Sequence, residues 1–240
     1  KVPLWNPYNF SGTSLIGNSQ AGIFYPFNLL FFLLPFQLAW TMLIILEPLL
    51  AGTFLYLYLR HQNISGLASV LGAIAWSFSG FSIAWLTWGT IVHAGLWLPL
   101  TLLSIDRLIA EYRNRKKLLW ATILVTSLSL TFFAGHMQIA LYSLLASLAY
   151  GAWHIKSERK NSMWFIGSIV LFLIMSSVQW VPLFQTIMTS SRIGDTVSWQ
   201  KEGWFLPWEH LVQFLAPDFF GNPTTLNYWG KWNYGEVVGY

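Results

Sequence analysis

The sequence predicts an all-α fold, a polytopic bundle of transmembrane helices, and three observations support this. Of the 240 residues, 55% are hydrophobic and only 9% are charged. A soluble domain carries about 25% charged residues, because its surface faces water. The hydrophobic residues occur in runs of about 20 residues, the length that crosses a bilayer as a helix. Aromatic residues make up 18% of the chain, and aromatic residues are enriched at membrane surfaces.

The hydrophobic runs predict about six spans in an order that divides the chain into three parts. A run at 29–34 is too short to cross a bilayer and stops at Pro35, so an interfacial or re-entrant piece is expected there. We predict an external loop (1–36), a six-span bundle (37–189) and an external polar, aromatic segment (190–240) with a short amphipathic helix at 207–215. The chain begins at Lys1 and ends within a motif-like stretch, so we expect an internal fragment. The predicted spans are 37–59, 66–86, 93–109, 118–134, 137–153 and 163–187.

The basic residues predict the orientation of the bundle. Short loops rich in Lys and Arg mark the cytoplasmic side of a membrane protein. Nine of the 13 Lys and Arg residues fall in short loops or helix ends on one side, and both termini then lie outside. The net charge of +4 therefore reflects membrane orientation, and nucleic acid is not expected as a partner. These nine residues are Arg60, Arg107, Arg113, Arg115, Lys116, Lys117, Lys156, Arg159 and Lys160.

Two helical patterns predict local structure without any chemistry. Small residues recur every four positions in the second span, which allows close helix packing in lipid; they are Ser65, Ser69, Ala73 and Ser77. The third span is expected to continue into the cytoplasm as a helix, because attractive pairs recur at four-residue spacing; they involve Arg107, Glu111 and Arg115.

The external segments contain the residues that are candidates for substrate binding. A flat aromatic face beside amide side chains suits a sugar, which has an apolar C–H face and hydroxyl groups around its edge. The alternative is that the aromatic residues lie among lipid headgroups and the Asn and Gly residues only make turns. No glycine-rich nucleotide-binding loop occurs in the sequence. The candidates are Trp5, Asn6, Tyr8, Asn18, Gln20, Trp88, His136, Gln138, Arg192, Asn222, Tyr228 and Trp229.

Several motifs, in order along the chain, resemble those of the YfhO-type bacterial membrane proteins. That family is regarded as polytopic glycosyltransferases of the GT-C class. The resemblance implies transfer of a sugar from a polyprenyl-phosphate donor to a cell-envelope glycopolymer or glycolipid outside the bacterial plasma membrane. It also implies a catalytic acidic residue in the first external loop, which we expect upstream of Lys1. The motifs are Leu4-Trp5-Asn6-Pro7-Tyr8, Phe10-Ser11-Gly12, Gly17-Asn18, Phe24-Tyr25-Pro26, Trp88-Gly89, Gly135-His136, Ala216-Pro217-Asp218-Phe219-Phe220-Gly221-Asn222-Pro223, Tyr228-Trp229-Gly230 and Asn233-Tyr234-Gly235-Glu236.

Asp218 and Glu236 are the candidate catalytic residues within this chain. A carboxylate there could act as general base on an acceptor hydroxyl or hold a divalent cation against the donor phosphate. The alternative is that Asp218 only stabilises a turn. His136 could donate to the lipid phosphate or fasten a helix turn, and His93 is a weaker candidate of the same kind. Arg192 could bind phosphate or act as an interfacial anchor.

Glu47 is an ionisable residue near the middle of the first predicted span. Such residues are costly in a membrane and suggest function. The alternative is a protonated Glu47 bonded to a carbonyl freed by Pro48. Glu47 favours the main rival function, a transporter or lipid flippase for envelope precursors, although no internal repeat supports it. A non-catalytic scaffold of an envelope assembly is a third possibility.

Overall fold

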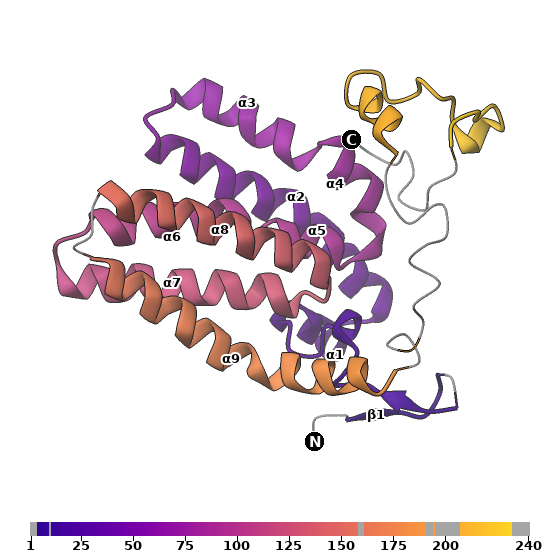
Figure 1. Ribbon diagram of the computed structural model, residues 1–240, viewed down its shortest axis with the longest axis horizontal. Coiled ribbons are helices and arrows are strands. Elements are labelled where there is room, and N and C mark those ends of the chain that lie inside the picture. Colours follow the sequence, from indigo (N-terminus) through magenta and orange to yellow (C-terminus); the bar gives the residue numbers. More distant parts are fainter. Residues whose placement is uncertain (1–3, 10, 158–160, 191–193, 195–206, 232–240) are drawn as a thin grey trace.

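The computed structural model describes all residues except 1–3, 10, 158–160, 191–193, 195–206 and 232–240. Its main feature is a bundle of helices that run back and forth between two ends (Figure 1). The elements are β1 (Trp5–Asn6), β2 (Thr13–Ser14), η1 (Ser19–Ala21), η2 (Pro26–Leu29), α1 (Leu30–Leu33), α2 (Phe36–His61), α3 (Gly66–Ser77), α4 (Gly80–Trp85), η3 (Leu86–Trp88), α5 (Ile91–Gly95), α6 (Leu98–Ala110), α7 (Asn114–Phe133), α8 (Met137–Ser157), α9 (Ser162–Met188), η7 (Trp208–Phe214) and η8 (Pro223–Thr225).

Within the described residues, the chain passes along the bundle six times, which agrees with the prediction of about six spans. Four helical segments are long and apolar enough to cross a membrane: Phe36–His61, Ile91–Ala110, Asn114–Phe133 and Ser162–Met188. The helix pair Gly66–Ser77 and Gly80–Trp88, bent by 41°, is together long and apolar enough to form a fifth span or a re-entrant loop. The sixth passage is α8, whose 21 residues run beside α6 and α7.

The bend in the second span was not predicted from its continuous apolar run, and a serine pair explains it. The hydroxyl of Ser79 accepts a hydrogen bond from the Ser82 backbone N–H at 3.3 Å, which starts a new helix. The hydroxyl of Ser82 donates to the Trp76 carbonyl at 3.2 Å, which satisfies a carbonyl at the end of α3. Local side-chain hydrogen bonds therefore replace the backbone bonds that a straight helix would make.

The turns divide into two groups, which we call the basic end and the aromatic end. The basic end contains the turns at 62–65 and 111–113 and the start of α9, with Arg60, Arg113 and Lys116 nearby. The aromatic end contains residues 4–35, 85–90, 134–138 and 207–231, so both terminal parts of the chain lie there (Figure 1). The predicted grouping of the connecting segments on one face is therefore present.

Two packing arrangements hold the bundle together. Three residues of the predicted small-residue stripe, Ser69, Ala73 and Ser77, are buried in α3, which packs against α2, whereas Ser65 is exposed and caps the start of the helix. A second core joins α6, α7 and α9 through Ile105, Leu124, Phe172 and their buried neighbours. Van der Waals contacts between closely packed helices thus stabilise the bundle, because the hydrophobic effect does not drive helix association within lipid.

The predicted extension of the third span is wrong, because α6 ends at Ala110 and α7 begins at Asn114. The Glu111 carboxylate accepts hydrogen bonds from the backbone N–H groups of Tyr112 and Arg113, both at 3.0 Å. These bonds lower the pKa of Glu111, with a smaller contribution from nearby Lys116. The carboxylate therefore stabilises a turn rather than a charged helix face.

Candidate functional site

The N-terminal hairpin presents two exposed aromatic side chains at the aromatic end. Trp5 pairs with Ser14 across β1 and β2 and is 59% exposed, and Tyr8 is 96% exposed. The Asn6 side-chain oxygen accepts a hydrogen bond from the Tyr8 N–H, so this oxygen is used within the turn. Gly12 has φ +113°, and a Cβ there would collide with the Trp5 ring. The hairpin therefore presents Trp5 and Tyr8 outward and orients Trp5 by contact with Gly12.

The next segment docks on the turn between α7 and α8. Asn18 accepts a hydrogen bond from the Gln20 N–H at 3.1 Å and thereby starts η1. Gln179 of α9 donates to the Ser19 carbonyl at 3.3 Å. A Cβ at Gly135, where φ is +99°, would lie 3.0 Å from the Ser19 carbonyl oxygen and 3.2 Å from that of Gln20. The predicted residues Asn18 and Gln20 are thus brought beside the predicted turn that carries His136.

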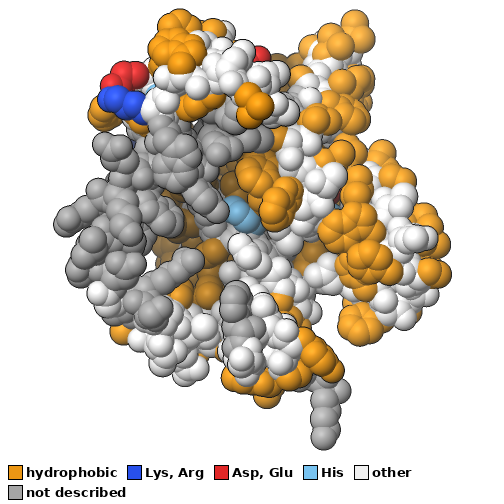
Figure 2. Space-filling view, turned by 90° about the vertical axis from the view of Figure 1, so that its right-hand side faces the viewer, with side chains coloured by type: hydrophobic (Ala, Val, Ile, Leu, Met, Phe, Trp, Pro, Cys, Tyr) orange, Lys and Arg blue, Asp and Glu red, His pale blue; other side chains and the backbone are white. Residues whose placement is uncertain are grey.

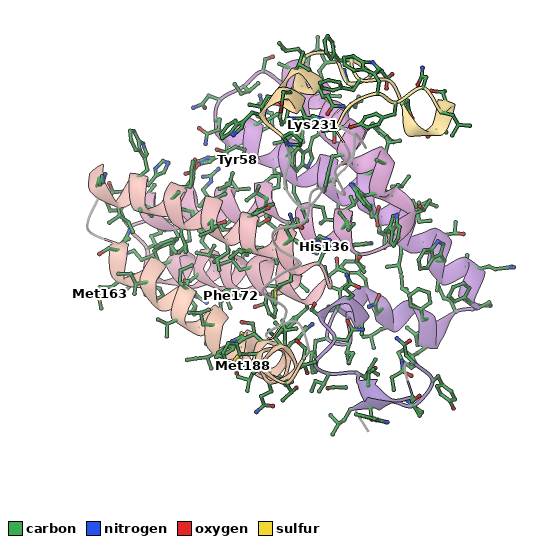
Figure 3. All side chains as sticks on the ribbon, turned by 45° about the vertical axis from the view of Figure 1, so that its right-hand side comes forward. Tyr58, His136, Met163, Phe172, Met188 and Lys231 are labelled. Atoms are coloured by element: carbon green, nitrogen blue, oxygen red, sulfur yellow. The ribbon has the colours of Figure 1, made fainter. Side chains whose placement is uncertain are left out.

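His136 lies in the central part of the aromatic end (Figure 3), before the first turn of α8. Its Nδ1 accepts a hydrogen bond from the Ile139 backbone N–H at 3.4 Å. Because Nδ1 is an acceptor, the ring proton of the neutral form is on Nε2. Partial burial lowers the pKa of His136, which favours this neutral form. Gln138 is exposed and donates to the Tyr142 hydroxyl at 2.8 Å.

Trp88 lies at the end of the bent span and is 63% exposed. Its ring is 5.8 Å from that of Trp85 in an edge arrangement. Gly89 has φ +65°, and a Cβ there would contact the Trp40 ring at 3.4 Å. Trp88 is therefore a second exposed aromatic surface, fixed by neighbouring indoles.

The C-terminal tail forms a separate aromatic cluster on the other side of the aromatic end from the hairpin (Figure 1). His210 stacks on Phe220 at 4.5 Å, and Phe220 packs edge-on against Trp229 at 4.8 Å. The Lys231 ammonium hydrogen-bonds the Glu209 carboxylate and lowers its pKa. The Tyr228 hydroxyl donates to the Lys231 carbonyl at 2.8 Å.

Asp218 is exposed within this tail, and its surroundings match both interpretations made from the sequence. Its Oδ1 accepts a hydrogen bond from the Asn222 side chain at 3.4 Å, and its carbonyl accepts one from the Gly221 N–H. The carboxylate thus contributes to a turn while remaining accessible. The predicted residues Arg192 and Glu236 lie outside the described part of the chain.

A buried polar array within the bundle was only partly anticipated. Glu47 and His93 are both fully buried, and the Glu47 Oε1 is 3.5 Å from the His93 Nε2. The other ring nitrogen, Nδ1, is 2.8 Å from the Tyr25 hydroxyl, and the Trp97 indole donates to that hydroxyl at 3.3 Å. The array thus connects the first span to the loop before it. Neither carboxylate oxygen of Glu47 has a hydrogen-bond partner among the described residues.

The proton direction in the Tyr25–His93 hydrogen bond depends on the tautomer of His93. The Trp97 indole N–H can only donate to the Tyr25 hydroxyl, which keeps one further lone pair and its own proton for Nδ1. The other ring nitrogen of His93, Nε2, faces Glu47. The sequence singled out Glu47 and His93 separately, but no sequence signal paired them. The hydrogen bond expected between Glu47 and a carbonyl freed by Pro48 is not present among the described residues, where Glu47 faces His93.

A second polar cluster, at the basic end, was missed altogether. Asp106 of α6 accepts a hydrogen bond from Gln62 at 2.7 Å. The Nε2 atoms of His61 and His154 lie 3.5 and 3.4 Å from its two carboxylate oxygens. Asp106 appeared in the sequence as one charge near a span end, and its partners come from two other helices. It ties α2, α6 and α8 together at this end.

An apolar groove of about 410 Å³ lies between α8 and α9. Both helices pack on α7, whose Phe132 lines the groove, and Met137 lies next to His136. Figure 2 looks onto the aromatic end and shows a histidine near the centre of this face, with hydrophobic side chains around it. The groove is lined by Phe132, Met137, Ala140, Leu141, Leu144, Phe172, Leu173, Ser176 and Trp180.

The divalent cation that the sequence left open has no evident site in the described part of the chain. No three His, Asp or Glu residues there are placed to hold a metal ion together. Asp218 has a neutral amide as its neighbour. We therefore derive no step of the chemistry through a metal.

These features define a polytopic α-helical membrane protein with polar, aromatic segments at one end of its bundle. Comparison with protein families gives a match to the model described as "Bacterial membrane protein YfhO" over residues 21–228. The chain therefore belongs to the YfhO family of bacterial membrane proteins, as its motifs indicated. No curated protein and no solved structure matches the chain.

Proposed function

We propose that this protein is a membrane glycosyltransferase that moves a sugar from a polyprenyl-phosphate donor to an acceptor in the cell envelope. The observation that carries the proposal is the position of His136, which lies in the turn beside the docked segment 18–20 and directly before Met137, a residue that lines the apolar groove. A lipid-linked sugar needs these two environments together. Its isoprenoid chain is apolar, whereas its phosphate and sugar are polar.

The groove between α8 and α9 suits the lipid chain, because its lining is almost entirely apolar. The His136 Nε2–H is then available to donate to the donor phosphate. A neutral histidine suits this role, since the phosphate must leave after transfer and a fixed cation would retain it. The amides of Gln20 and Gln138 and the rings of Trp5 and Trp88 are available to the sugars.

The transfer itself is a substitution at the anomeric carbon. The oxygen of an acceptor hydroxyl forms a bond to that carbon, and the bond from the carbon to the phosphate oxygen breaks. The lipid phosphate leaves with the bonding electron pair, and a general base takes the hydroxyl proton. Asp218 is the accessible carboxylate of the described tail that we assign to this role, with Glu236 as the other candidate. The active face is proposed to be extracytoplasmic at the bacterial plasma membrane.

The test is a transfer assay with the full-length protein in lipid nanodiscs. The probes are tritiated polyprenyl phosphates carrying glucose or N-acetylglucosamine, and the acceptor is envelope glycopolymer from cells that lack the protein. Leu173→Trp fills the groove and is expected to raise KM for the donor about tenfold. This corresponds to losing the binding free energy of about two buried methylenes. The matched control is Ile174→Trp, since Ile174 is 63% exposed and does not line the groove.

Two further variants separate binding from chemistry. His136→Ala is expected to raise KM for the donor, and Asp218→Asn is expected to lower kcat by about 100-fold or more, the usual contribution of a general base. Normal kcat in Asp218→Asn would remove Asp218 from the mechanism. No transfer from any donor by the unsubstituted protein would overturn the proposed activity.

A transporter for lipid-linked envelope precursors is the second candidate, and the buried Glu47–His93 pair favours it. Ionisable residues inside a membrane often form proton or substrate pathways. That function requires movement of an intact lipid-linked precursor across the bilayer without cleavage of the sugar–phosphate bond. The measurement is flux of fluorescent polyprenyl phosphate into proteoliposomes. Flux that is lost in Glu47→Gln, together with the absence of sugar transfer in all variants, would favour the transporter.

A further inference from the structure

A second groove lies at the basic end, between α7 and α9, far from the site described above. Its volume is about 310 Å³. Met163, which lies near the start of α9 at the basic end in Figure 3, lines it. A Cβ added at Gly167 would meet no atom within 4 Å, so the groove wall is open at that position. The lining residues are Leu118, Ala121, Thr122, Val125, Met163, Trp164, Gly167, Ser168 and Leu171.

The groove begins beside a concentration of positive charge at the start of α7. Four consecutive or nearly consecutive residues there are basic: Arg113, Arg115, Lys116 and Lys117. The nearby acid, Glu111, is occupied by the backbone N–H groups of Tyr112 and Arg113. The charge at this end of the groove is therefore strongly positive.

Lys117 is the residue that links the charge to the groove. Lys117 lies one helical turn before Ala121, which lines the groove. Lys117 is only 7% exposed. Within the described residues, no carboxylate lies within ion-pair distance of its ammonium group. A lysine so deeply buried is usually paired, so a bound anion would supply the partner that the described residues do not.

The N-terminus of α7 adds a second attraction for an anion. Arg113 precedes the helix and its side chain does not cap it. The N–H groups of Lys116 and Lys117 donate to the Arg113 carbonyl, which leaves those of Asn114 and Arg115 for an anion. The dipole of this 20-residue helix places partial positive charge at the same point. An apolar groove that ends at such a point matches a molecule with a hydrocarbon chain and an anionic head.

We propose that this groove binds an anionic phospholipid of the leaflet at the basic end. One acyl chain lies along the groove past Gly167, and the phosphate lies against Lys117 and the first N–H groups of α7. A soluble phosphate would leave the apolar groove unexplained, and a zwitterionic headgroup would place its own cation beside Arg113, Arg115 and Lys116. Basic pockets between helices on the cytoplasmic side are a general mode of lipid recognition.

Native mass spectrometry of the detergent-purified, full-length protein tests this. The probes are dioleoyl phosphatidylglycerol and dioleoyl phosphatidylcholine, titrated separately. We expect phosphatidylglycerol to be retained more strongly. Lys117→Gln should weaken its binding about fivefold, the usual contribution of one lysine at an anionic lipid surface. Gly167→Leu should weaken it about tenfold by displacing about two methylenes of the chain.

Matched controls separate this site from general attraction to lipid. Lys156→Gln removes the same charge from the same end of the bundle, on α8, and should leave binding unchanged. Gly66→Leu adds the same side chain at another glycine with no atom within 4 Å of its Cβ position. Equal binding of the two lipids, or equal losses in Lys117→Gln and Lys156→Gln, would overturn the proposal. Unchanged binding in Gly167→Leu would overturn the groove as the chain site.

Discussion

At the scale of single residues, the Glu47–His93 pair is the most unusual feature of the bundle. Both side chains are fully buried, and their closest atoms are 3.5 Å apart. A buried ionisable pair gives little net stability, because its desolvation offsets its attraction. Loss of one partner is different, since the remaining polar group is then left in an apolar environment.

We therefore expect His93→Leu to lower the free energy of unfolding by about 3 kcal/mol. The double variant Glu47→Leu/His93→Leu should recover part of this loss, because the buried Glu47 carboxylate is no longer left without a partner, whereas the Tyr25 hydroxyl still loses its hydrogen bond to His93. Thermal unfolding in a single detergent, followed by circular dichroism, measures both. If the double variant is less stable than His93→Leu alone, the two side chains do not form the coupled pair that their distance indicates.

Gly135 is a second residue whose role depends on its surroundings. Its φ of +99° and its close approach to the Ser19 and Gln20 carbonyls both require the absence of a side chain. Gly135→Ala should cost about 2 kcal/mol through backbone strain and contact, and should loosen segment 18–20. Hydrogen exchange of residues 18–22 measures the loosening. Gly167→Ala is the control, since it meets no atom and should keep or slightly raise stability.

At the scale of elements, α2 and α3 illustrate how small residues hold two spans together. The Ser77 hydroxyl donates to the Pro48 carbonyl at 2.9 Å, and a Cβ at Gly52 would lie 2.7 Å from that hydroxyl oxygen. The two helices can therefore approach closely only because residue 52 has no side chain. This contact also fixes α2 where it presents Glu47 to His93.

Gly52→Leu is accordingly expected to separate α2 from α3 and to lower the unfolding temperature by several degrees, as overpacking commonly costs about 1–3 kcal/mol. Gly66→Leu, at the open start of α3, should have almost no effect. Thermal unfolding of the two variants gives the comparison. Equal stability of both would mean that the α2–α3 contact does not depend on close approach at Gly52.

At the scale of the whole molecule, orientation in the membrane determines which side the aromatic end faces. Short basic turns favour the cytoplasm for the basic end. The chain has no cysteine, so single cysteines can be introduced without background. We expect Tyr8→Cys and Leu226→Cys, at 96% and 94% exposed positions, to react with a membrane-impermeant maleimide on intact cells or spheroplasts.

Asn114→Cys, at the exposed start of α7, should react only after the membrane is opened. This pattern follows if the basic turns remain inside. Labelling of Asn114→Cys in intact cells together with protection of Tyr8→Cys would reverse the orientation and remove the extracytoplasmic active face. Equal expression of the three variants, measured by immunoblot, is the control.

The sequence by itself determined the helical class, the number of passages along the bundle and the grouping of polar, aromatic segments at one end. These follow from local rules, because lipid requires each span to satisfy its own backbone hydrogen bonds and each apolar run to match the bilayer. The small-residue stripe in α3 followed for the same reason. Candidate binding residues such as Asn18 and His136 were also visible, through their motifs.

Only the tertiary structure decided which of these residues meet. Glu47 and His93 lie in different spans, and the partners of Asp106 come from two other helices. Gln20 and Gly135 are far apart in the sequence but lie side by side in the structure. Such contacts depend on helix order and rotation, which an apolar run does not encode. The bend at Ser79 and the end of α6 at Ala110 were not predicted from the sequence, because two local side-chain hydrogen bonds form at each place and hydropathy does not register them.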